Sequence, residues 1–453
     1  MIQLNPKRRE HINSKANEVY DLIKTFPIEK KKSSKEKGTI KEKPELDITN
    51  RVVDALVRIQ MVSILGEEYD CTEEYQDKKY GFDKLCYPQL IKFVSLINST
   101  SEINSRVSEK FVKDKSIHIL FDWYRTSKFK PGLFCDLLLD YCNNAIIDHE
   151  YNFPIAHLEI DKFIKLGHCL IYFYTSEELS SKEKKYDENK LNKNGNNPYS
   201  YLRKDVLGIP LIKTEIKAES EKGYELAFEE CSLTIDCIKV CCLTTNLPQY
   251  EISFDIDCRT VASDWYKYYS NPVNNQDHIT IHQYRPAKPH HLDATEWQDI
   301  LSMGIEKLNW FLLNRSMHNT ELCDLITGSI KRYAQAISTH NLHQRIIYMF
   351  TILESLLLKD ENASIIESVS KYLPKIIFTK PEDRKFAVNL LKKMYKVRSA
   401  SIHHALEKKF EMEDLRKLQI MIVLLIMKLI SRLKTYKSKN SILEEIDNRI
   451  LNA

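Results

Sequence analysis

The stretch LHQRIIYMFTILESLLL, residues 342–358, decides the fold of this chain because it is a long amphipathic pattern with no helix breaker. Six of its apolar side chains fall on one stripe at the spacing of an α-helix; they are Ile346, Met349, Phe350, Leu353, Leu356 and Leu357. A helix with one apolar stripe must bury it against other elements. The stretch therefore predicts a packed helical domain around it.

The segments on both sides of this stretch show the same amphipathic pattern. Helical patterns occur at 297–313, 322–337, 363–373, 382–397 and about 411–433. We expect Pro374 to end the helix before it and Pro381 to open the next one, since proline is tolerated only in the first turn. Short connections between amphipathic helices predict an antiparallel helical bundle over residues 295–453.

The part of the chain before this bundle has a mixed pattern. Residues 1–44 end in a Lys/Glu-rich tract and are expected to be a flexible charged segment. In the region 45–290 we expect a helical block to about residue 180, a mobile Lys/Asn-rich loop at 180–200 and a strand-rich part at 224–284. The helical block includes apolar segments at 46–65, 87–97, 132–147 and 160–174, and a proline-bearing linker at 283–297 closes the region. The expected fold class is mainly α with a β-containing middle segment.

Length and charge exclude several classes of protein. A chain of 453 residues is expected to form two or three domains. Its 67 Lys and Arg nearly balance 63 Asp and Glu, so a polyanion would have to bind at a local site. The 10 glycines form neither a dinucleotide-binding fingerprint nor a phosphate-binding loop.

Apolar runs and cysteines indicate the compartment. The longest apolar run, 418–427, is about half of what a bilayer requires, and the first residues lack the apolar core of an export signal. We therefore expect a cytoplasmic protein that does not bind a membrane, with its 11 cysteines reduced. Cys231, Cys237, Cys241 and Cys242 lack a C-x-x-C spacing and are expected to be buried thiols rather than zinc ligands. His290 and His291 are expected in the linker.

The segment KVRSASIHH, residues 396–404, places Arg398 five positions before His403. A second R-x-x-x-x-H string begins at Arg285, but its prolines deny it a rigid scaffold, and we take it as a chance occurrence. Five residues advance an α-helix by about 500°, which leaves the two side chains about 140° apart. Arg398 and His403 can therefore share a site only if the helix breaks near residues 399–401, or if a second chain contributes one of them.

An arginine and a histidine without a carboxylate cluster suit phosphodiester transesterification. The guanidinium binds a phosphate and stabilises the extra charge of the transition state. The imidazole acts as general base or acid near neutral pH. RNA supplies its own 2'-hydroxyl nucleophile, so this reaction needs no metal and no cofactor.

The C-terminal third, about residues 300–435, resembles the C-terminal domain of the HEPN superfamily, in its ApeA-like branch of prokaryotic antiviral proteins. The resemblance rests on the helix that contains Glu354, a proline-interrupted helix, and then the R-S-x-x-x-H string of Arg398, Ser399 and His403. Family members often have glycine after the histidine, where this chain has His404. This departure leaves open whether His404 assists, substitutes or only packs.

The resemblance implies a metal-independent endoribonuclease of an anti-phage, abortive-infection system. Arg398 would bind the scissile phosphate and His403 would be the acid/base, with Glu354, Ser399 and His404 in supporting positions. It also implies an RNA substrate and a homodimer in which two motifs meet through the C-terminal domain. Residues 45–290 would then sense infection, through a phage-derived activator for example, or restrain the nuclease.

Other interpretations of the same residues stay open. On spacing alone, Arg398 and His403 are a pair on a helix surface, and the bundle would be a catalytically inactive dimerisation or binding module. Glu354 either orients Arg398 or lies on a solvated helix edge. A third alternative, a CRISPR-associated nuclease with a cyclic-oligonucleotide sensor, would require a Rossmann-like domain that the glycine-poor N-terminal part does not favour.

Overall fold

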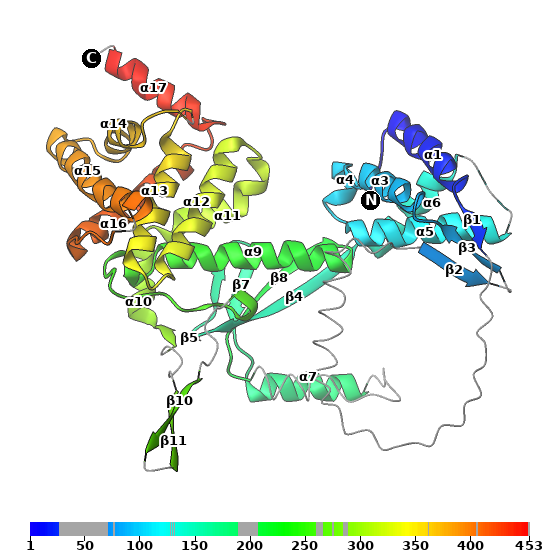
Figure 1. The fold of residues 1–453 in the computed structure, drawn as a ribbon, viewed down its shortest axis with the longest axis horizontal. Helices are drawn as coiled ribbons and strands as arrows, with labels where there is room; N and C mark the ends of the chain where they lie inside the picture. Colours follow the sequence, from blue (N-terminus) through cyan, green and yellow to red (C-terminus); the bar gives the residue numbers. More distant parts are fainter. Residues whose placement is uncertain are drawn as a thin grey trace. The chain divides into compact units, whose positions relative to one another are not determined.

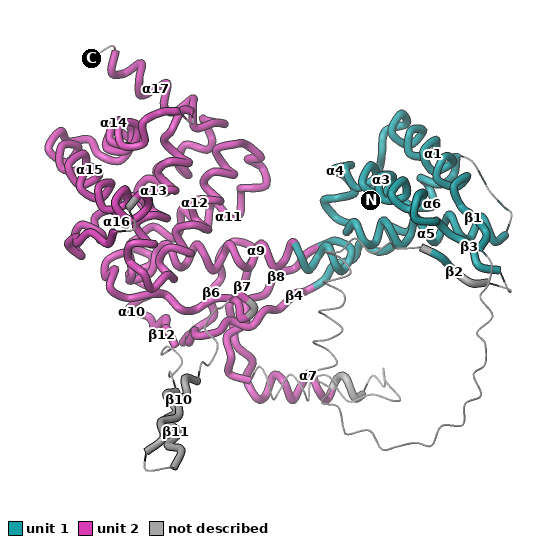
Figure 2. Tube along the Cα trace, viewed as in Figure 1, with its two compact units in different colours: residues 1–149, 217–225 teal, residues 150–216, 226–453 magenta. Residues whose placement is uncertain are grey.

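The computed structural model describes residues 1–26, 71–75, 78–126, 128, 130, 132–188, 207–259, 266–273, 276–283, 289–360, 362–404 and 406–451. The chain forms two compact units, which Figure 2 distinguishes by colour. Unit 1 contains residues 1–149 and 217–225, and unit 2 contains residues 150–216 and 226–453. Both candidate sites discussed below belong to unit 2.

Unit 1 is a small helical unit with a three-stranded antiparallel sheet of order β1-β3-β2. Its elements are α1 (Pro6–Tyr20), β1 (Lys24–Phe26), β2 (Cys71–Tyr75), β3 (Lys78–Phe82), α3 (Tyr87–Asn98), α4 (Ser101–Asn104), α5 (Glu109–Thr126) and α6 (Phe134–Ala145). The Asn5 side chain accepts a hydrogen bond from the Arg8 amide and caps α1, which then opens with proline. Apolar faces of α1, α3, α5 and α6 meet in one core.

Unit 2 begins with a five-stranded sheet of order β6-β7-β8-β4-β9. Its elements are β4 (Ile147–Ala156), β5 (Leu158–Ile160), β6 (Ile164–Leu166), β7 (Cys169–Tyr172), α7 (Ser176–Glu188), β8 (Leu211–Ala218), α9 (Ser220–Val240), η1 (Leu243–Thr245), β9 (Asp255–Ile256) and η2 (Asp257–Arg259). The strand β7 pairs antiparallel with β6 and β8, with Ile171 opposite Ile164 on one side and Ile212 on the other. In Figure 1 the green helix α9 runs alongside these strands, and both contribute to one core.

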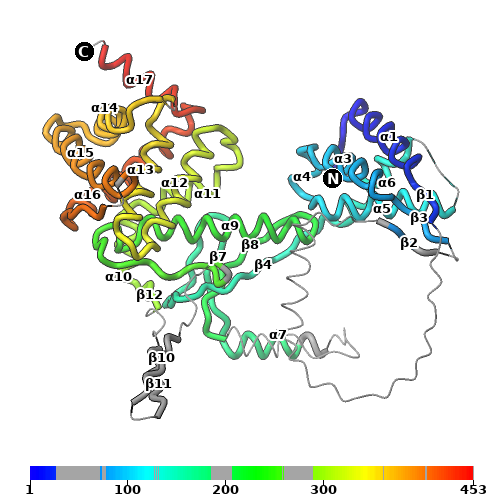
Figure 3. Tube along the Cα trace, viewed as in Figure 1, coloured from blue at the N-terminus to red at the C-terminus, as the bar shows by residue number. Residues whose placement is uncertain are grey.

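The rest of unit 2 is helical. After the β10–β11 hairpin (Tyr266–Val273 and Gln276–Gln283) and β12 (His290–Leu292), the helices are α10 (Ala294–Ser302), α11 (Ile305–Asn314), η3 (Arg315–Met317), α12 (Glu321–Ile337), α13 (Leu342–Leu357), α14 (Ile365–Ile377), α15 (Pro381–His404), α16 (Met412–Ile430) and α17 (Lys439–Leu451). The helix α13 packs against α12, α14, α15 and α16 (Figure 3). Its predicted apolar stripe is buried in full. The mainly α class with a β-containing part is therefore what the chain adopts.

The strand prediction for 224–284 is wrong over its first part. Residues 220–240 form one long helix, α9, and residues 231–242 are all buried. Because this part of the helix is covered on every side, apolar residues occur at every helical position and the 3.6-residue period disappears. Strands do occur later in the stretch, at β9 and in the β10–β11 hairpin.

Residues 160–174, predicted to be helical or mixed as part of the helical block, contain strands instead of a helix. These residues form the end of β5 together with β6 and β7. Gly167 adopts φ 58° in the tight connection between β6 and β7, a conformation that glycine tolerates readily. A Cβ at Gly167 would lie 2.8 Å from the Cβ of Leu312, so the close approach of the turn to α11 also requires glycine.

Several boundaries differ from their predictions. The segment predicted as flexible at 1–44 contains α1 and β1, and the predicted mobile loop at 180–200 begins within α7. The predicted linker contains β12, which pairs in parallel with β5. Pro374 lies inside α14 and does not end it, and α17 follows the helix that was expected to be last. The predicted helix at 46–65 lies outside the described residues.

Among the helices of the described residues, none is both long and apolar enough to cross a membrane.

Candidate functional site

Arg398 and Glu354 form an ion pair between two helices of the C-terminal region. The Arg398 guanidinium, on α15, donates to Glu354 Oε1, on α13, at 2.8 Å. The two side chains are 12% and 23% exposed, so water screens this pair only in part. Glu354 is therefore the ion-pair partner of Arg398 in the single chain.

Aromatic packing holds Arg398 from a second direction. Its guanidinium carbon lies 5.6 Å from the centroid of the Tyr395 ring, one turn earlier on α15. Tyr395 in turn packs edge-on against Phe350 of α13. The Arg398 Nε is buried and has no hydrogen-bond partner among the described residues. The guanidinium is thus fixed in place while retaining an unused donor.

Partial burial also changes the carboxyl group of the pair. Desolvation raises the pKa of Glu354, and the positive charge of Arg398 acts in the opposite direction. The positive charge of Arg398 therefore offsets part of the effect of burial on the pKa of Glu354. Removing either side chain would leave the other without its compensating charge.

His403 is exposed near the C-terminal end of α15. The helix does not break at residues 399–401, because α15 is continuous from Pro381 to His404. Serine is accommodated there because the Ser401 hydroxyl donates to the carbonyl of Val397 four residues earlier, at 3.1 Å. Ser399 is half-buried in the same helix, and His404 is its last residue. The structure therefore does not bring Arg398 and His403 onto one face of a single chain.

Exposed apolar side chains occur at the end of α15 and in the residues that follow it. Ile402 is 43% exposed and Leu406 is 62% exposed, and Met412 at the start of α16 is exposed as well. Leu406 is tied to the helix end because its amide donates to the Ala400 carbonyl at 3.2 Å. We call Ile402, Leu406 and Met412 the apolar end of α15. Ile402 directly precedes His403 in the sequence, and Leu406 and Met412 follow it within nine residues.

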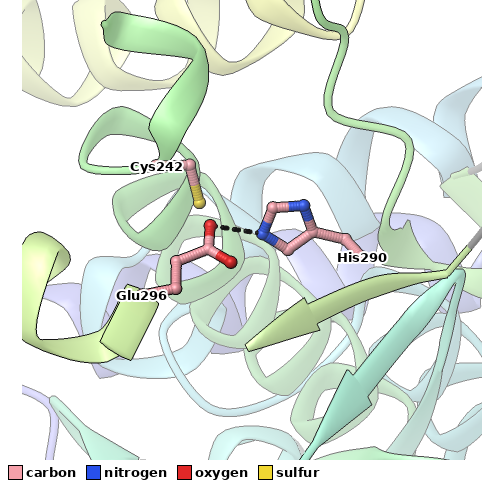
Figure 4. Close-up of side chains that lie close together, drawn as sticks. All are labelled: Cys242, His290 and Glu296. Carbon is pink, nitrogen blue, oxygen red and sulfur yellow. Dashed lines mark hydrogen bonds and ion pairs between the residues drawn. The ribbon is translucent and has the colours of Figure 1, made fainter. Parts of the chain in front are cut away.

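A second group of reactive side chains consists of Cys242, His290 and Glu296 (Figure 4). One ligand atom from each side chain lies within 4.8 Å of the other two. His290 Nε2 lies 2.7 Å from Glu296 Oε1. Cys242 is buried, and burial raises the pKa of its thiol well above the usual range. The cluster thus combines a soft sulfur, an imidazole and a carboxylate.

Three separate elements position this cluster. Cys242 directly precedes η1, His290 lies on β12, and Glu296 lies in the first turn of α10. The Asp293 side chain caps α10 by accepting from the Glu296 amide at 2.8 Å. The Phe254 ring packs against the His290 ring at 5.2 Å. Sequence reasoning missed this cluster because Cys242 is distant along the chain and His290 was assigned to a linker.

A polar cavity of about 760 Å³ lies between α9, η2 and α12. Its wall contains buried Lys239, which donates to Asp255 at 2.7 Å. Arg259 contacts Asp236 at 3.0 Å and Asp255 at 3.3 Å. Burial raises the pKa of Asp236 to about 6, although Arg259 and Lys239 act against this shift. The wall also contains the ion pair between Lys331 and Glu229, at 3.1 Å, and Arg332.

Comparisons with known proteins give no match: no family model, no curated protein and no solved structure matches this chain.

Proposed function

We propose that the chain is a metal-independent endoribonuclease of a prokaryotic anti-phage system of the abortive-infection type. It cleaves RNA at a site built from Arg398 and His403. The observation that supports this most is the Arg398 guanidinium, which Glu354 and Tyr395 hold in place five positions before the exposed His403. Rigid support of this kind is what a phosphate-binding arginine requires.

The proposed reaction uses only groups of the RNA and of the chain. Arg398 binds the non-bridging oxygens of the scissile phosphate and stabilises the charge that develops on them. His403 removes the proton of the 2'-hydroxyl, and the 2'-oxygen attacks phosphorus while the bond to the 5'-oxygen breaks. An imidazolium protonates the leaving 5'-oxygen. The products carry a 2',3'-cyclic phosphate and a 5'-hydroxyl.

The proposed site is completed by a second copy of the chain. Because α15 is continuous, Arg398 and His403 of one chain diverge by about 140°. In a two-fold dimer, Arg398 of one protomer can meet His403 of the other, and two equivalent sites result. The apolar end of α15 provides exposed hydrophobic surface beside His403 for such an interface. Residues 45–290 would then sense infection or restrain the nuclease.

One observation favours a second candidate, an inactive bundle that serves in dimerisation or binding. Arg398 is mostly buried and is already paired with Glu354 in the single chain. An arginine in such a pair is also what a purely structural role would require. The two candidates differ in whether RNA is cut, and a cleavage assay separates them.

The test compares RNA ends from phage-infected cells and from reactions with the purified full-length chain. The wild type should generate new ends with 2',3'-cyclic phosphate, and Arg398→Ala and His403→Ala should each lose at least about 100-fold of this activity. His340→Ala, which alters an exposed histidine between α12 and α13, is the matched control. Unchanged cleavage in both site variants, or ends with 5'-phosphate, would overturn the proposal. A wild type that makes no new ends would favour the binding module.

A further inference from the structure

Cys242, His290 and Glu296 have the chemistry of a transition-metal site. Zinc prefers thiolate sulfur, imidazole nitrogen and carboxylate oxygen in a tetrahedral arrangement. Calcium and magnesium prefer sets made of oxygen ligands alone, which a cluster with one carboxylate does not offer. The ligand types therefore select an ion of the zinc class.

The geometry of the cluster is close to that of a bound ion. Zinc lies about 2.0–2.3 Å from such ligands, so neighbouring ligand atoms of a tetrahedral site are about 3.5 Å apart. The atoms of the cluster are at most 4.8 Å apart, and His290 Nε2 and Glu296 Oε1 are 2.7 Å apart. Small side-chain movements would bring the three atoms to the separations that zinc requires. In Figure 4 the sulfur of Cys242 points toward the carboxylate and the ring.

The surroundings favour a metal that neutralises the cluster. His290 and Glu296 are 18% and 16% exposed, and Cys242 is 1% exposed. An unpaired thiolate is costly in such a place. A divalent ion with one thiolate, one carboxylate and one neutral imidazole has no net charge. The bound ion thus removes the cost of burying the two anions.

We propose that Cys242, His290 and Glu296 bind one Zn²⁺ ion. On binding, the sulfur–hydrogen bond of Cys242 is replaced by a sulfur–zinc bond and the proton passes to solvent. The proton that His290 Nε2 donates to Glu296 in the metal-free chain is given up to solvent while Nδ1 carries the proton of the neutral ring, so that Nε2 binds zinc, and Glu296 binds through one carboxylate oxygen. No redox change occurs, and a water molecule fills the fourth position. The ion links the end of α9 to β12 and α10, where the C-terminal helices begin.

The site is separate from the proposed ribonuclease site in residues and in chemistry. Arg398 and His403 act on RNA without a metal, and the zinc ion takes no part in that reaction. Metal binding is therefore measured directly rather than through RNA cleavage. An active nuclease that binds no metal would overturn only the zinc proposal, and an inactive chain that binds zinc would overturn only the nuclease.

The test titrates the purified full-length chain, stripped with a chelator and kept reduced without added thiol, with Co²⁺ and then Zn²⁺. The wild type should bind one equivalent of Co²⁺, show a thiolate-to-cobalt charge-transfer band, and lose this band when Zn²⁺ displaces Co²⁺. Cys242→Ser should abolish the band, and His290→Gln and Glu296→Gln should each weaken binding by at least about tenfold. Cys241→Ser alters the adjacent buried cysteine and should leave both the charge-transfer band and the metal affinity unchanged.

Circular dichroism and urea denaturation of each variant establish that it is folded. If Cys242→Ser does not fold, the nearly isosteric Glu296→Gln decides the question through its Zn²⁺ affinity. The proposal is overturned if the wild type shows no band, or if Cys242→Ser retains it. It is also overturned if Glu296→Gln binds as tightly as the wild type.

Discussion

In the proposed ribonuclease, Arg398 must satisfy two requirements, a stable place in the bundle and a free donor for phosphate. Glu354 and the Tyr395 ring meet the first requirement. A guanidinium has five N–H groups, so the contact of one nitrogen with Glu354 leaves other donors. At this residue, structural and catalytic roles are compatible.

Glu354→Gln should both destabilise the chain and reduce RNA cleavage. Glutamine leaves the mostly buried guanidinium of Arg398 without its counter-charge. We expect this to lower the free energy of unfolding by about 1–3 kcal/mol. Urea denaturation measures this cost. Glu407→Gln, at an exposed position after α15, is the control and should stay within about 0.5 kcal/mol of the wild type. A Glu354→Gln variant as stable as this control would show that the ion pair contributes nothing.

Asp236 should make the free energy of unfolding fall as pH rises, which is opposite to the usual effect of an aspartate. Its folded-state pKa of about 6 lies above the ordinary value for aspartate, so between about pH 4 and pH 6 the folded state binds a proton that the unfolded state has lost. This group therefore contributes a stability that falls as pH rises through that window. Burial and the charges of Lys239, Asp255 and Arg259 set the size of this shift in pKa. The shift corresponds to about 3 kcal/mol of the free energy of unfolding.

Asp236→Asn removes this titration. The stability of the variant relative to the wild type should increase between pH 4 and pH 7, as measured by denaturant unfolding at several pH values. Other titrating groups are shared by both proteins and cancel in the difference. A difference that is constant with pH, or that falls as pH rises, would contradict the raised pKa of Asp236.

At the level of elements, prediction from sequence succeeded where one helix face is exposed. The stripe from Ile346 to Leu357 repeats every three to four residues because α13 has a partly exposed side, and the sequence therefore predicts this helix correctly. The helix α9 lacks that contrast around residues 231–242, where all positions are buried. Its β-branched residues then favoured a strand, although tertiary burial outweighs such propensities.

Arg345 ties three segments of unit 2 together and should be sensitive to a conservative change. It is 1% exposed and donates to the carbonyls of Pro248, Tyr250, Ile337 and Thr339. These contacts link the loop after η1 and the end of α12 to the first turn of α13. Lysine keeps the charge but lacks the planar fork of donors.

Arg345→Lys should therefore lower the free energy of unfolding by about 2–4 kcal/mol, because several buried carbonyls lose their donors. Chemical denaturation gives the value, and Arg332→Lys, at an exposed position of α12, serves as the matched control. Equal stabilities of the two variants would mean that Arg345 does not link these segments.

For the whole molecule, the site could be predicted only in part. The sequence placed Arg398, Glu354 and His403 on two helices of one bundle, because amphipathic periodicity and proline positions are local signals. Whether α15 breaks after Arg398 depends on packing along the whole helix; of the two alternatives that the sequence left open, the break does not occur, and the second chain stays a prediction. The cluster at Cys242 depends on contacts between distant segments, for which periodicity offers no signal.

The apolar end of α15 should mediate dimerisation. Leu406→Glu places a charge on a side chain that is 62% exposed in the single chain, and should weaken self-association by at least about tenfold. Sedimentation at several protein concentrations measures this effect. Leu451→Glu alters an equally apolar and exposed side chain on α17 and should leave the dimer intact. Loss of the dimer in both variants, or in neither, would place the interface elsewhere.

A mixing experiment tests the shared ribonuclease site most directly. Arg398→Ala and His403→Ala chains are co-expressed or mixed under exchanging conditions, and new 2',3'-cyclic phosphate ends are counted. Each variant alone should be inactive. The mixture should regain about a quarter of the wild-type activity, since half of the dimers are mixed and each has one intact site of two. A mixture as inactive as its components would contradict a site shared between protomers, and full activity in either variant alone would contradict the assignment of Arg398 and His403.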